Sequence, residues 1–212
     1  MGNKIYIYGA NGFGREVLNL FREIHNIDEK ELKQYVSFVD DNRDICGTQI
    51  SGIDVCSIDE ADIEKGEFIV AIASPVIRQM IVDKLPKKTK YKTLIHPSAN
   101  VGMNVKIGEG AIICAGSILT CDINIGTHCY LNLNTTIGHD CKIGNYFTTA
   151  PAVNISGNCM IGERVYFGTK SATRQGNTIA SDVLVGMSAN VIKDLSVQGS
   201  YIGTPAKLME PR

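Results

Sequence analysis

A histidine followed directly by a carboxylate is the residue pair in this chain best suited to chemistry. His139 and Asp140 stand in the segment Ile137-Gly138-His139-Asp140-Cys141, and the whole chain has only four histidines. A carboxylate beside an imidazole can hold one ring nitrogen protonated and raise the basicity of the other, which suits a general base. The same pair also fits an ordinary exposed turn, so its meaning depends on the element that carries it.

The segment around His139 belongs to a six-residue repeat. An apolar residue returns at every sixth position, with only two threonines in the series. Small or β-branched residues such as Cys129 and Val153 usually follow four positions later. A period of six fits neither an α-helix nor a simple strand, but it predicts a parallel β-helix of stacked hexapeptides. The series is Ile95, Val101, Ile107, Ile113, Leu119, Ile125, Leu131, Ile137, Ile143, Thr149, Ile155, Ile161, Phe167, Thr173, Ile179, Val185, Val191 and Val197.

If three hexapeptides make one coil, residues eighteen apart stack at the strand spacing of roughly 4.8 Å. The stack through His139 then contains Cys121, His139, Gly157, Gln175 and Lys193. Gly157 would leave room for a slender ligand beside the imidazole, and Lys193 would lie about 14 Å from it. We therefore predict an extended ligand whose reactive end lies at His139 and whose anionic end lies near basic residues of the last coils, namely Lys170, Arg174, Lys193 and Lys207.

Two further groups near His139 leave alternatives open. The thiol of Cys121, in the same stack, could be a nucleophile activated by His139. Asn132 and Asn134 occupy the preceding hexapeptide. A side-chain amide there could orient an acceptor substrate, or it could form an asparagine turn.

The first 94 residues have a different rhythm, so we predict one domain over residues 1–94 and a β-helix domain over residues 95–212. Apolar residues at helical spacing predict a helix over 15–25 and a second that begins at Pro75. Short β-branched and aromatic runs predict strands at 4–8, 35–39, 68–73 and 91–95. This order predicts βαβ units that form a small, Rossmann-like parallel sheet.

A glycine-rich turn follows the first of these strands. Glycines let backbone N–H groups approach a phosphate, and the start of a helix favours an anion. Asp40 and Asp41 end the second strand, at the edge where a ribose or base could bind. The glycine spacing is not the dinucleotide order and the domain is about half the size that fold requires, which argues against a redox cofactor. A tight strand–helix turn and a solvated acidic turn remain the alternatives. The substrate-binding residues expected here are Gly9, Asn11, Gly12, Phe13, Gly14, Asp40 and Asp41.

Composition narrows the class of protein. The net charge is −1 and the basic residues are scattered, so no nucleic-acid-binding face is expected. Cys129, Cys141 and Cys159 fall on small interior positions and no Cys-x-x-Cys pair occurs, so we expect reduced core cysteines and no metal site. The N-terminus lacks a secretory signal, and no segment approaches the roughly 20 apolar residues of a membrane span. We expect a cytoplasmic protein.

Five segments resemble the sugar acetyltransferases with left-handed β-helices related to the sialic-acid O-acetyltransferases and the bacillosamine-pathway N-acetyltransferases. They span the chain in the order expected for that family. These segments are Ile5-Tyr6-Ile7-Tyr8-Gly9-Ala10-Asn11-Gly12-Phe13-Gly14, Val39-Asp40-Asp41, Ile95-His96-Pro97-Ser98-Ala99, Ile137-Gly138-His139-Asp140-Cys141 and Gly203-Thr204-Pro205-Ala206-Lys207.

The resemblance implies a homotrimer with active sites between neighbouring left-handed β-helices. It implies that the N-terminal domain binds a nucleotide-activated sugar and that acetyl-CoA, a cosubstrate, lies along the solenoid. His139 matches the general base, Asp140 its acidic companion and Asn132 a residue near the acceptor. The acceptor would then attack the thioester directly while His139 removes a proton. The expected cofactor-binding residues are Thr148, Gly157, Gly168, Gly186, Lys193 and Lys207.

Two departures from the family pattern concern ligand contacts. Some relatives carry a histidine where this chain has Phe13, and some carry one near the coenzyme where this chain has Thr148.

We expect N-acetylation of a nucleotide-linked 4-amino-deoxysugar in bacterial surface-glycan biosynthesis. The alternatives are O-acetylation of a sialic acid or other sugar and, in another class, a non-catalytic trimeric scaffold or nucleotide-binding module.

Overall fold

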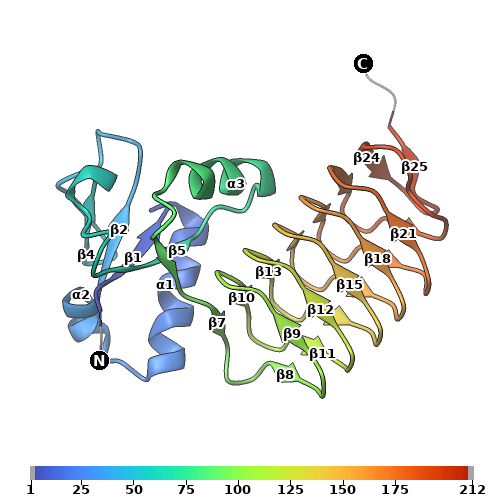
Figure 1. The fold of residues 1–212 in the computed structure, drawn as a ribbon, viewed down its shortest axis with the longest axis horizontal. Coiled ribbons are helices and arrows are strands. Elements are labelled where there is room, and N and C mark those ends of the chain that lie inside the picture. Colours follow the sequence, from blue (N-terminus) through green and yellow to red (C-terminus); the bar gives the residue numbers. More distant parts are fainter. Residues whose placement is uncertain (1–2, 210–212) are drawn as a thin grey trace. The chain divides into compact units, whose positions relative to one another are not determined.

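The computed structural model describes residues 3–209, and the chain divides into two compact units at Leu94 and Ile95, apart from Ser74–Val76. Each unit is described by itself. The first contains a six-stranded sheet with helices, and the second is a β-solenoid (Figure 1).

Strand β1 lies in the middle of the first sheet because its residues are buried on both faces. It pairs in parallel with β2 on one side and β5 on the other, and the full order is β3-β4-β2-β1-β5-β6. A run of apolar residues buried on both faces is typical of a parallel sheet covered by helices. The strands are β1 (Ile5–Tyr8), β2 (Val36–Val39), β3 (Gln49–Ile50), β4 (Ile53–Cys56), β5 (Glu67–Val70) and β6 (Lys90–Tyr91).

Helix α1 (Gly12–His25) buries the apolar side predicted from its spacing, including Val17, Leu18 and Phe21. It begins three residues earlier than predicted because the Asn11 side chain caps its first backbone N–H groups. The remaining helical segments are η1 (Glu29–Glu31), α2 (Leu32–Tyr35), η2 (Ile58–Glu60) and α3 (Pro75–Lys84), the last beginning at the predicted proline.

The prediction for this sheet was incomplete in two places. The hairpin of β3 and β4 was not predicted, because β3 has only two residues, and its Gln49 pairs with Asp54 on an exposed face. The predicted strand over 91–95 was wrong as one element. It separates into β6, which joins the first sheet, and β7 (Leu94–Ile95), which joins the solenoid.

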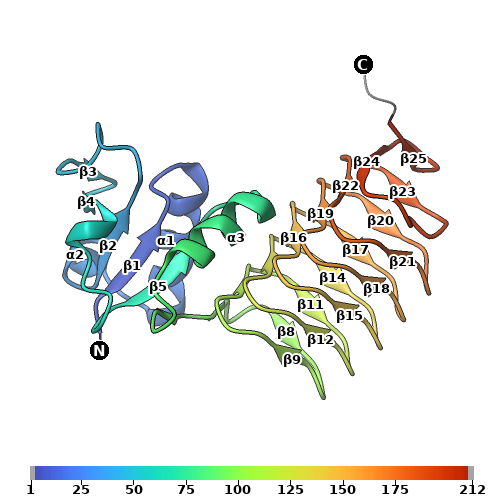
Figure 2. The same cartoon turned by 45° about the horizontal axis from the view of Figure 1, so that its top comes forward.

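The second unit is a left-handed solenoid whose short strands form three sheets (Figures 1 and 2). Sheet I contains β7, β10 (Ile112–Ile113), β13 (Tyr130–Leu131), β16 (Thr148–Thr149), β19 (Tyr166–Phe167), β22 (Val183–Val185), β24 (Gly199–Ile202) and β25 (Lys207–Leu208). Sheet II contains β8 (Asn100–Val101), β11 (Ile118–Leu119), β14 (Thr136–Ile137), β17 (Asn154–Ile155), β20 (Ala172–Thr173) and β23 (Asn190–Val191). Sheet III contains β9 (Lys106–Ile107), β12 (Asn124–Ile125), β15 (Lys142–Ile143), β18 (Met160–Ile161) and β21 (Thr178–Ile179).

Residues eighteen apart pair directly in this solenoid, as predicted. Ile137 of β14 pairs with Ile155 of β17, and Ile143 of β15 pairs with Ile161 of β18. One coil therefore consists of three hexapeptides, and each coil turns three corners. We name them corner A, after the strands of sheet I, corner B, after those of sheet II, and corner C, after those of sheet III.

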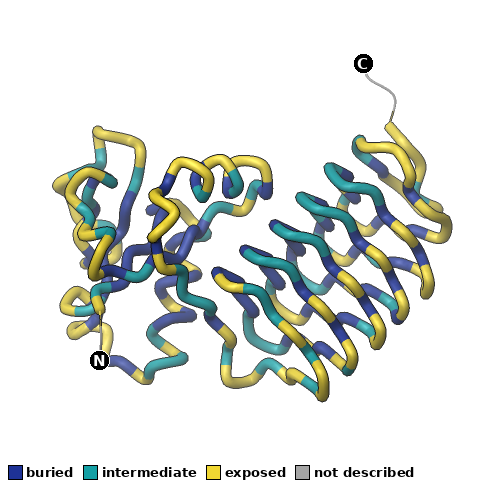
Figure 3. The backbone as a smooth tube through the Cα atoms, in the orientation of Figure 1, coloured by how far each residue is buried: buried dark blue, intermediate teal, exposed yellow. Residues whose placement is uncertain are grey.

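From Ile113 onward the interior is built from the two predicted positions of the hexapeptides, and buried segments recur along these coils (Figure 3). The prediction was wrong for Ile95 and Val101 of the first coil, which are 37% and 38% exposed. Cys129, Cys141 and Cys159 are buried and carry free thiols, as predicted. The apolar six-residue series is interrupted by two polar residues, Thr149 and Thr173. The Thr149 hydroxyl lies 2.8 Å from that of Thr135, and the Thr173 hydroxyl accepts a hydrogen bond from the Ser156 amide at 3.1 Å. Their polar atoms are thus paired, which makes their burial tolerable.

The six-residue series does not continue to Val197, and that part of the prediction was wrong. Val197 is 55% exposed, whereas Leu195 is buried and pairs with Ile179, sixteen residues before it. Val185 likewise pairs with Tyr201. The last coil is therefore two residues shorter than the others, and β25 then turns back antiparallel to β24.

Within residues 3–209, the helices are all too short or too polar to cross a lipid bilayer.

Candidate active site

The His139–Asp140 pair lies at corner B, just after β14. The Nδ1 atom of His139 is 2.7 Å from Oδ2 of Asp140, and their side chains are 51% and 61% exposed. Asp140 has a left-handed backbone conformation, with φ of 61°, which turns its carboxylate toward the ring. With the carboxylate on Nδ1, the neutral imidazole presents Nε2 as its proton acceptor. The two side chains thus project from the coil, as predicted, and are arranged as a general base requires.

Gly157 lies directly against the His139 imidazole on the next coil. A Cβ atom at position 157 would stand 2.6 Å from Nε2 and 2.8 Å from Cε1 of His139. Backbone hydrogen bonds carry the stack through both neighbouring coils, from Asp140 N to Cys121 O and from Asn158 N to His139 O. The predicted stacking of His139 on Gly157 is therefore confirmed, and only glycine leaves the imidazole in this position.

The stack continues toward basic residues at the far end of the solenoid. Strands β20 and β23 keep the eighteen-residue register, which places Lys193 at corner B of the last coil. That corner is two residues shorter than the one above it, because Leu195 pairs with Ile179, so the predicted in-register stacking of Lys193 on Gln175 was wrong. Arg174, also at corner B, lines a groove of about 370 Å³ together with Thr204 and Pro205. Lys170 lies at corner A and Lys207 in β25, and all four predicted basic side chains are exposed. Only Arg174 and Lys193 share the corner of His139.

Asn132 lies at corner A, so a whole strand, β14, separates it from His139 within one chain. The backbone N–H of Asn132 donates to the Thr149 hydroxyl at 2.9 Å. Its side-chain Oδ1 accepts a hydrogen bond from the backbone N–H of Leu133 at 2.7 Å. Gly168 and Gly186 lie in the same stack as Asn132, eighteen residues apart. The structure therefore divides the predicted site residues between two corners: Asn132, Gly168 and Gly186 at corner A, and His139, Asp140, Gly157 and Lys193 at corner B.

Thr148 cannot contact a coenzyme as predicted. It is only 3% exposed, and its hydroxyl lies 3.5 Å from the carbonyl of Tyr146. Thr148 comes directly before Thr149, the interior residue of β16, so its side chain was expected to point outward. The structure shows that this side chain is buried.

The alternative that Cys121 is a nucleophile also loses support. Desolvation, followed by the hydrogen bond to Asp122, raises the pKa of the Cys121 thiol, so the reactive thiolate is disfavoured.

Corner C is occupied by polar groups that pair with one another along the stack. Asn145 accepts from the Thr127 amide and donates to Glu163, whose own amide donates to Ser181. Arg164 binds Asp182 through two nitrogens, at 2.7 and 2.8 Å. These side chains are committed to intramolecular bonds, which makes corner C structural.

Replacing Asp182 by Asn is expected to lower the Tm at pH 7 by roughly 2–4 °C. The hydrogen bond from Arg164 lowers the pKa of Asp182 below its ordinary value. A carboxylate whose pKa is depressed by folding stabilises the protein above its unfolded pKa of about 3.9 and loses that contribution as the pH falls through the folded value. Melting curves between pH 7 and pH 3 should therefore show the two proteins converge in acid. A constant difference would mean that the charge of Asp182 contributes nothing.

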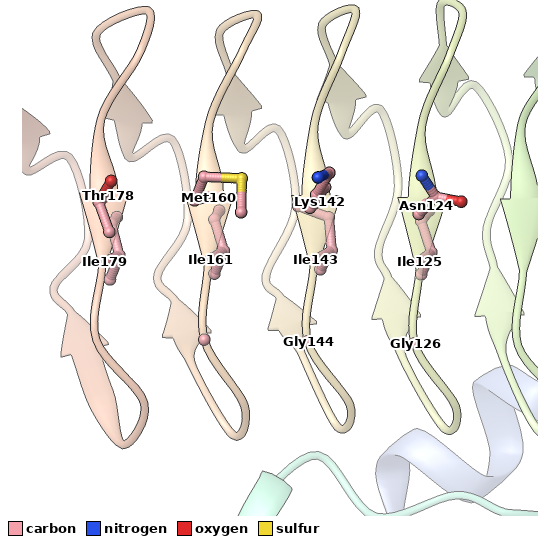
Figure 4. A pocket seen from close by; sticks show the side chains of 11 residues that line it. Asn124, Ile125, Gly126, Lys142, Ile143, Gly144, Met160, Ile161, Thr178 and Ile179 are labelled. Atoms are coloured by element: carbon pink, nitrogen blue, oxygen red, sulfur yellow. The ribbon is translucent and has the colours of Figure 1, made fainter.

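A shallow groove of about 560 Å³ runs along the outward face of sheet III. Figure 4 shows Asn124, Lys142, Met160 and Thr178 projecting along it, with Gly126 and Gly144 at one side. His139 is not among its lining residues, and its mixed polar and apolar lining holds no acid–base pair. Across residues 3–209, no three His, Cys, Asp or Glu side chains gather as metal ligands would.

In the first unit, the glycine-rich turn is held by its own contacts. Gly9 has φ of 104°, and a Cβ at Gly14 would stand 1.9 Å from the Gly9 carbonyl oxygen, so both positions require glycine for packing. The Asn11 side chain accepts from the amides of Phe13 and Gly14 at 3.2 and 3.5 Å. These two amides at the start of α1 are thus occupied by the Asn11 side chain, while binding of a phosphate by the turn stays a prediction.

The two acidic residues after β2 have different partners. Asp40 accepts from the Ala10 amide through Oδ2 and from the Asn42 amide through Oδ1, each at 2.9 Å. Asp41 accepts from the Tyr8 hydroxyl at 2.6 Å. Asp40 therefore braces the turn, and the exposed Asp41 is the carboxylate available to a ligand.

Sequence reasoning did not single out Arg15. Its guanidinium lies 3.9 Å from the position that a Cβ of Gly12 would occupy, so it extends beside the turn. The signal was present as a basic residue directly after Gly14, at the start of the helix.

Comparison with known proteins gives consistent matches over the whole chain. Residues 4–85 match the family model described as the PglD N-terminal domain. The GDP-perosamine N-acetyltransferase of Escherichia coli O157:H7 is 31% identical over 175 residues, which cover 80% of this chain and 77% of that protein.

Two solved structures share the fold of both units. WeeI from Acinetobacter baumannii AYE has 31% identity and a TM-score of 0.88, over 97% of this chain and 99% of that chain. PerB from Caulobacter crescentus, solved in complex with CoA and GDP-perosamine, has 28% identity and a TM-score of 0.86, over 98% and 97% of the two chains. The chain therefore belongs to the hexapeptide-repeat sugar acetyltransferases, a family of coenzyme A-dependent enzymes with left-handed β-helices.

Proposed function

We propose that this protein is a cytoplasmic N-acetyltransferase that transfers the acetyl group of acetyl-CoA to the amino group of a nucleotide-linked amino-deoxysugar in bacterial surface-glycan biosynthesis. The observation that carries the proposal is the His139–Asp140 pair, 2.7 Å apart and stacked on Gly157, in a chain that resembles GDP-perosamine N-acetyltransferase along 80% of its length.

His139 is the general base of this proposal. As the neutral sugar amine attacks the thioester carbonyl, Nε2 of His139 removes a proton from the nitrogen, and Asp140 stabilises the imidazolium that forms. A new N–C bond replaces the C–S bond of the thioester, and the departing CoA thiolate accepts the proton from the His139 imidazolium. The hydrogen bond at Nδ1 keeps the required tautomer before each turnover.

We propose a homotrimer because the residues assigned to acceptor and coenzyme lie at two different corners. A long ligand can contact corner B of one chain, from Gly157 toward Lys193, and the Asn132–Gly168–Gly186 stack of a second chain when two solenoids lie side by side. Lys193 and Lys207 would then attract the phosphates of the coenzyme.

The shared site can be tested with two inactive variants. His139→Ala and Asn132→Ala damage different corners, so coexpressed chains should form mixed trimers in which some sites contain both intact residues. Recovery of activity in the mixture, with each variant alone impaired, is the expected result. Full activity of an isolated monomer, identified by light scattering, would contradict the shared site.

In the first unit we propose that Asp41, Phe13 and Gly12 contact the nucleotide, and that Arg15 pairs with its phosphates. Gly9, Gly14, Asn11 and Asp40 hold the shape of the turn.

The proposed reaction is tested by following release of the CoA thiol with GDP- and UDP-linked amino sugars and with the matching sugars that carry a hydroxyl instead. Thiol release with an amino sugar and an alkali-stable acetyl product are expected. Turnover of the hydroxyl sugars, with an alkali-labile product, would establish O-acetylation instead. A protein that neither turns over nor gains thermal stability with CoA would be a scaffold, since a bound ligand stabilises the state that binds it.

A further inference from the structure

The carboxyl end of the first sheet places two consecutive carboxylates beside the glycine-rich turn. Backbone amides from two segments occupy both oxygens of Asp40, which ties the turn after β1 to the end of β2. Asp41 has no such brace in the described structure. Its Oδ1 atom accepts a hydrogen bond from the phenolic hydroxyl of Tyr8 at 2.6 Å.

Tyr8 is well suited to orient a carboxylate. It is the last residue of β1, is only 5% exposed, and is held in the core of the unit between Val39 and Val70. A rigid buried ring that donates to an ionised oxygen at this distance forms a charge-assisted bond, which is stronger than a neutral one. Burial, together with that bond, raises the pKa of the Tyr8 hydroxyl far above its ordinary range, so it stays a donor at neutral pH.

Asp41 keeps acceptor capacity after this bond is made. An ionised carboxylate offers about four lone-pair sites, and Tyr8 uses one of them. The side chain is exposed at the carboxyl edge of a parallel sheet, where ligands of such sheets bind. A carboxylate held in one orientation is complementary to two adjacent N–H or O–H donors, such as those of a ribose diol or of the guanine edge.

We propose that Tyr8 is a positioning residue of the nucleotide site: its hydroxyl holds the Asp41 carboxylate in the orientation that accepts paired donors of the nucleoside. This inference rests on the proposed function for the identity of the ligand. The two acidic residues then have different roles: Asp40 binds backbone amides of the turn, and Asp41 accepts hydrogen bonds from the ligand.

The test is removal of one oxygen atom. Tyr8→Phe keeps the ring and its packing but releases Asp41, and calorimetry should show roughly a tenfold rise in the Kd of the preferred nucleoside diphosphate. The KM for the nucleotide sugar should rise to a similar extent while kcat stays within about twofold, because Tyr8 acts on binding and not on proton transfer.

Tyr6→Phe is the matched control. Tyr6 lies on the same face of β1, is 8% exposed, and uses its hydroxyl to accept from the Asp62 amide at 3.1 Å, away from the acidic pair. Both variants lose one hydroxyl from the same strand, so a general loss of stability would affect both alike. Only Tyr8→Phe should change nucleotide affinity, and equal affinities in the two variants would overturn the inference.

Four nucleotides distinguish the donors that Asp41 accepts. GDP and IDP differ by the exocyclic amino group of guanine, UDP lacks the purine edge, and 2′-deoxy-GDP lacks one ribose hydroxyl. If Asp41 reads guanine, the effect of Tyr8→Phe should be present for GDP and 2′-deoxy-GDP and small for IDP and UDP. If it reads the ribose, the effect should be present for GDP, IDP and UDP and small for 2′-deoxy-GDP.

A second variant protects the test against a folding defect in Tyr8→Phe. Asp41→Asn changes an exposed side chain and should weaken nucleotide binding by itself. In the double variant, Tyr8→Phe should add little, because the two residues act as one unit. Additive losses would contradict the positioning role.

These measurements separate the inference from the proposed function. Calorimetry of nucleotide binding needs no turnover, so a protein that binds GDP or UDP through Tyr8 but acetylates no sugar would refute the proposed reaction alone. A protein that acetylates a nucleotide sugar with the same KM before and after Tyr8→Phe would refute the role of Tyr8 alone.

Discussion

Replacing His139 by Ala is expected to lower kcat by roughly 10²–10⁴-fold, the usual contribution of a general base. The imidazole is hydrogen-bonded to the neighbouring Asp140 side chain and is half exposed, so folding should not depend on it. The KM for the nucleotide sugar should change little, since the nucleotide contacts are assigned to the first unit. The measurement is steady-state thiol release from acetyl-CoA, accompanied by a melting curve.

Asp140→Asn is the companion variant. It keeps the size of the side chain but removes the charge that stabilises the imidazolium, so kcat should fall by less than in His139→Ala. The double variant should be no slower than His139→Ala, because Asp140 acts through the imidazole. Near-normal turnover by a folded His139→Ala protein would exclude His139 as the base.

Gly157→Ala is expected to lower kcat by roughly 10²-fold without removing any catalytic group, because displacement of a reacting group by about 1 Å has an effect of this size. The new methyl group would stand 2.6 Å from Nε2 of His139, a distance that real contacts do not reach, so the ring must move. Position 157 has no left-handed φ, and alanine is therefore acceptable to the backbone itself.

The control for Gly157→Ala is Gly144→Ala on corner C. Its Cβ would stand 2.6 Å from the carbonyl carbon of Gly162, a clash with backbone that disturbs the packing of the coils at least as strongly but lies away from the imidazole. Both variants should lose thermal stability, and only Gly157→Ala should lose most of its turnover. If the two variants lost turnover equally, the contact between Gly157 and His139 would have no special role.

Much of the solenoid was predictable because its determinants are local and repeated. Most hexapeptides contribute the same two interior positions, so the periodicity predicted the β-helix. The stacking of His139 on Gly157 followed from it on the assumption of three hexapeptides in each coil, which the structure confirms. The series was wrong at Val197, where the coil shortens by two residues, because Leu195 and Tyr201 are buried there instead. Leu195 and Val197 are both apolar, so the periodicity alone cannot show which of the two residues is buried.

In the first unit, the βαβ order and the two main helices were predictable from apolar runs and from Pro75. The hairpin of β3 and β4 was not predicted, because β3 has only two residues, although Ile53, Asp54 and Val55 of β4 do alternate between buried and exposed positions. The glycine-rich turn was recognised, but glycine spacing alone does not show whether an amide is open to a phosphate or capped, as Asn11 caps those of Phe13 and Gly14.

The sequence by itself determined that a β-helix carries an exposed His-Asp pair, because a repeat of six residues and a pair of neighbours are both properties of short segments. The tertiary structure decided how residues far apart are divided among sites. It placed Asn132 and His139 at different corners, buried Thr148, and gave Asp40 two backbone amides and Asp41 the Tyr8 hydroxyl. Those outcomes depend on which strands become neighbours and which side chains are covered, and a linear pattern contains neither.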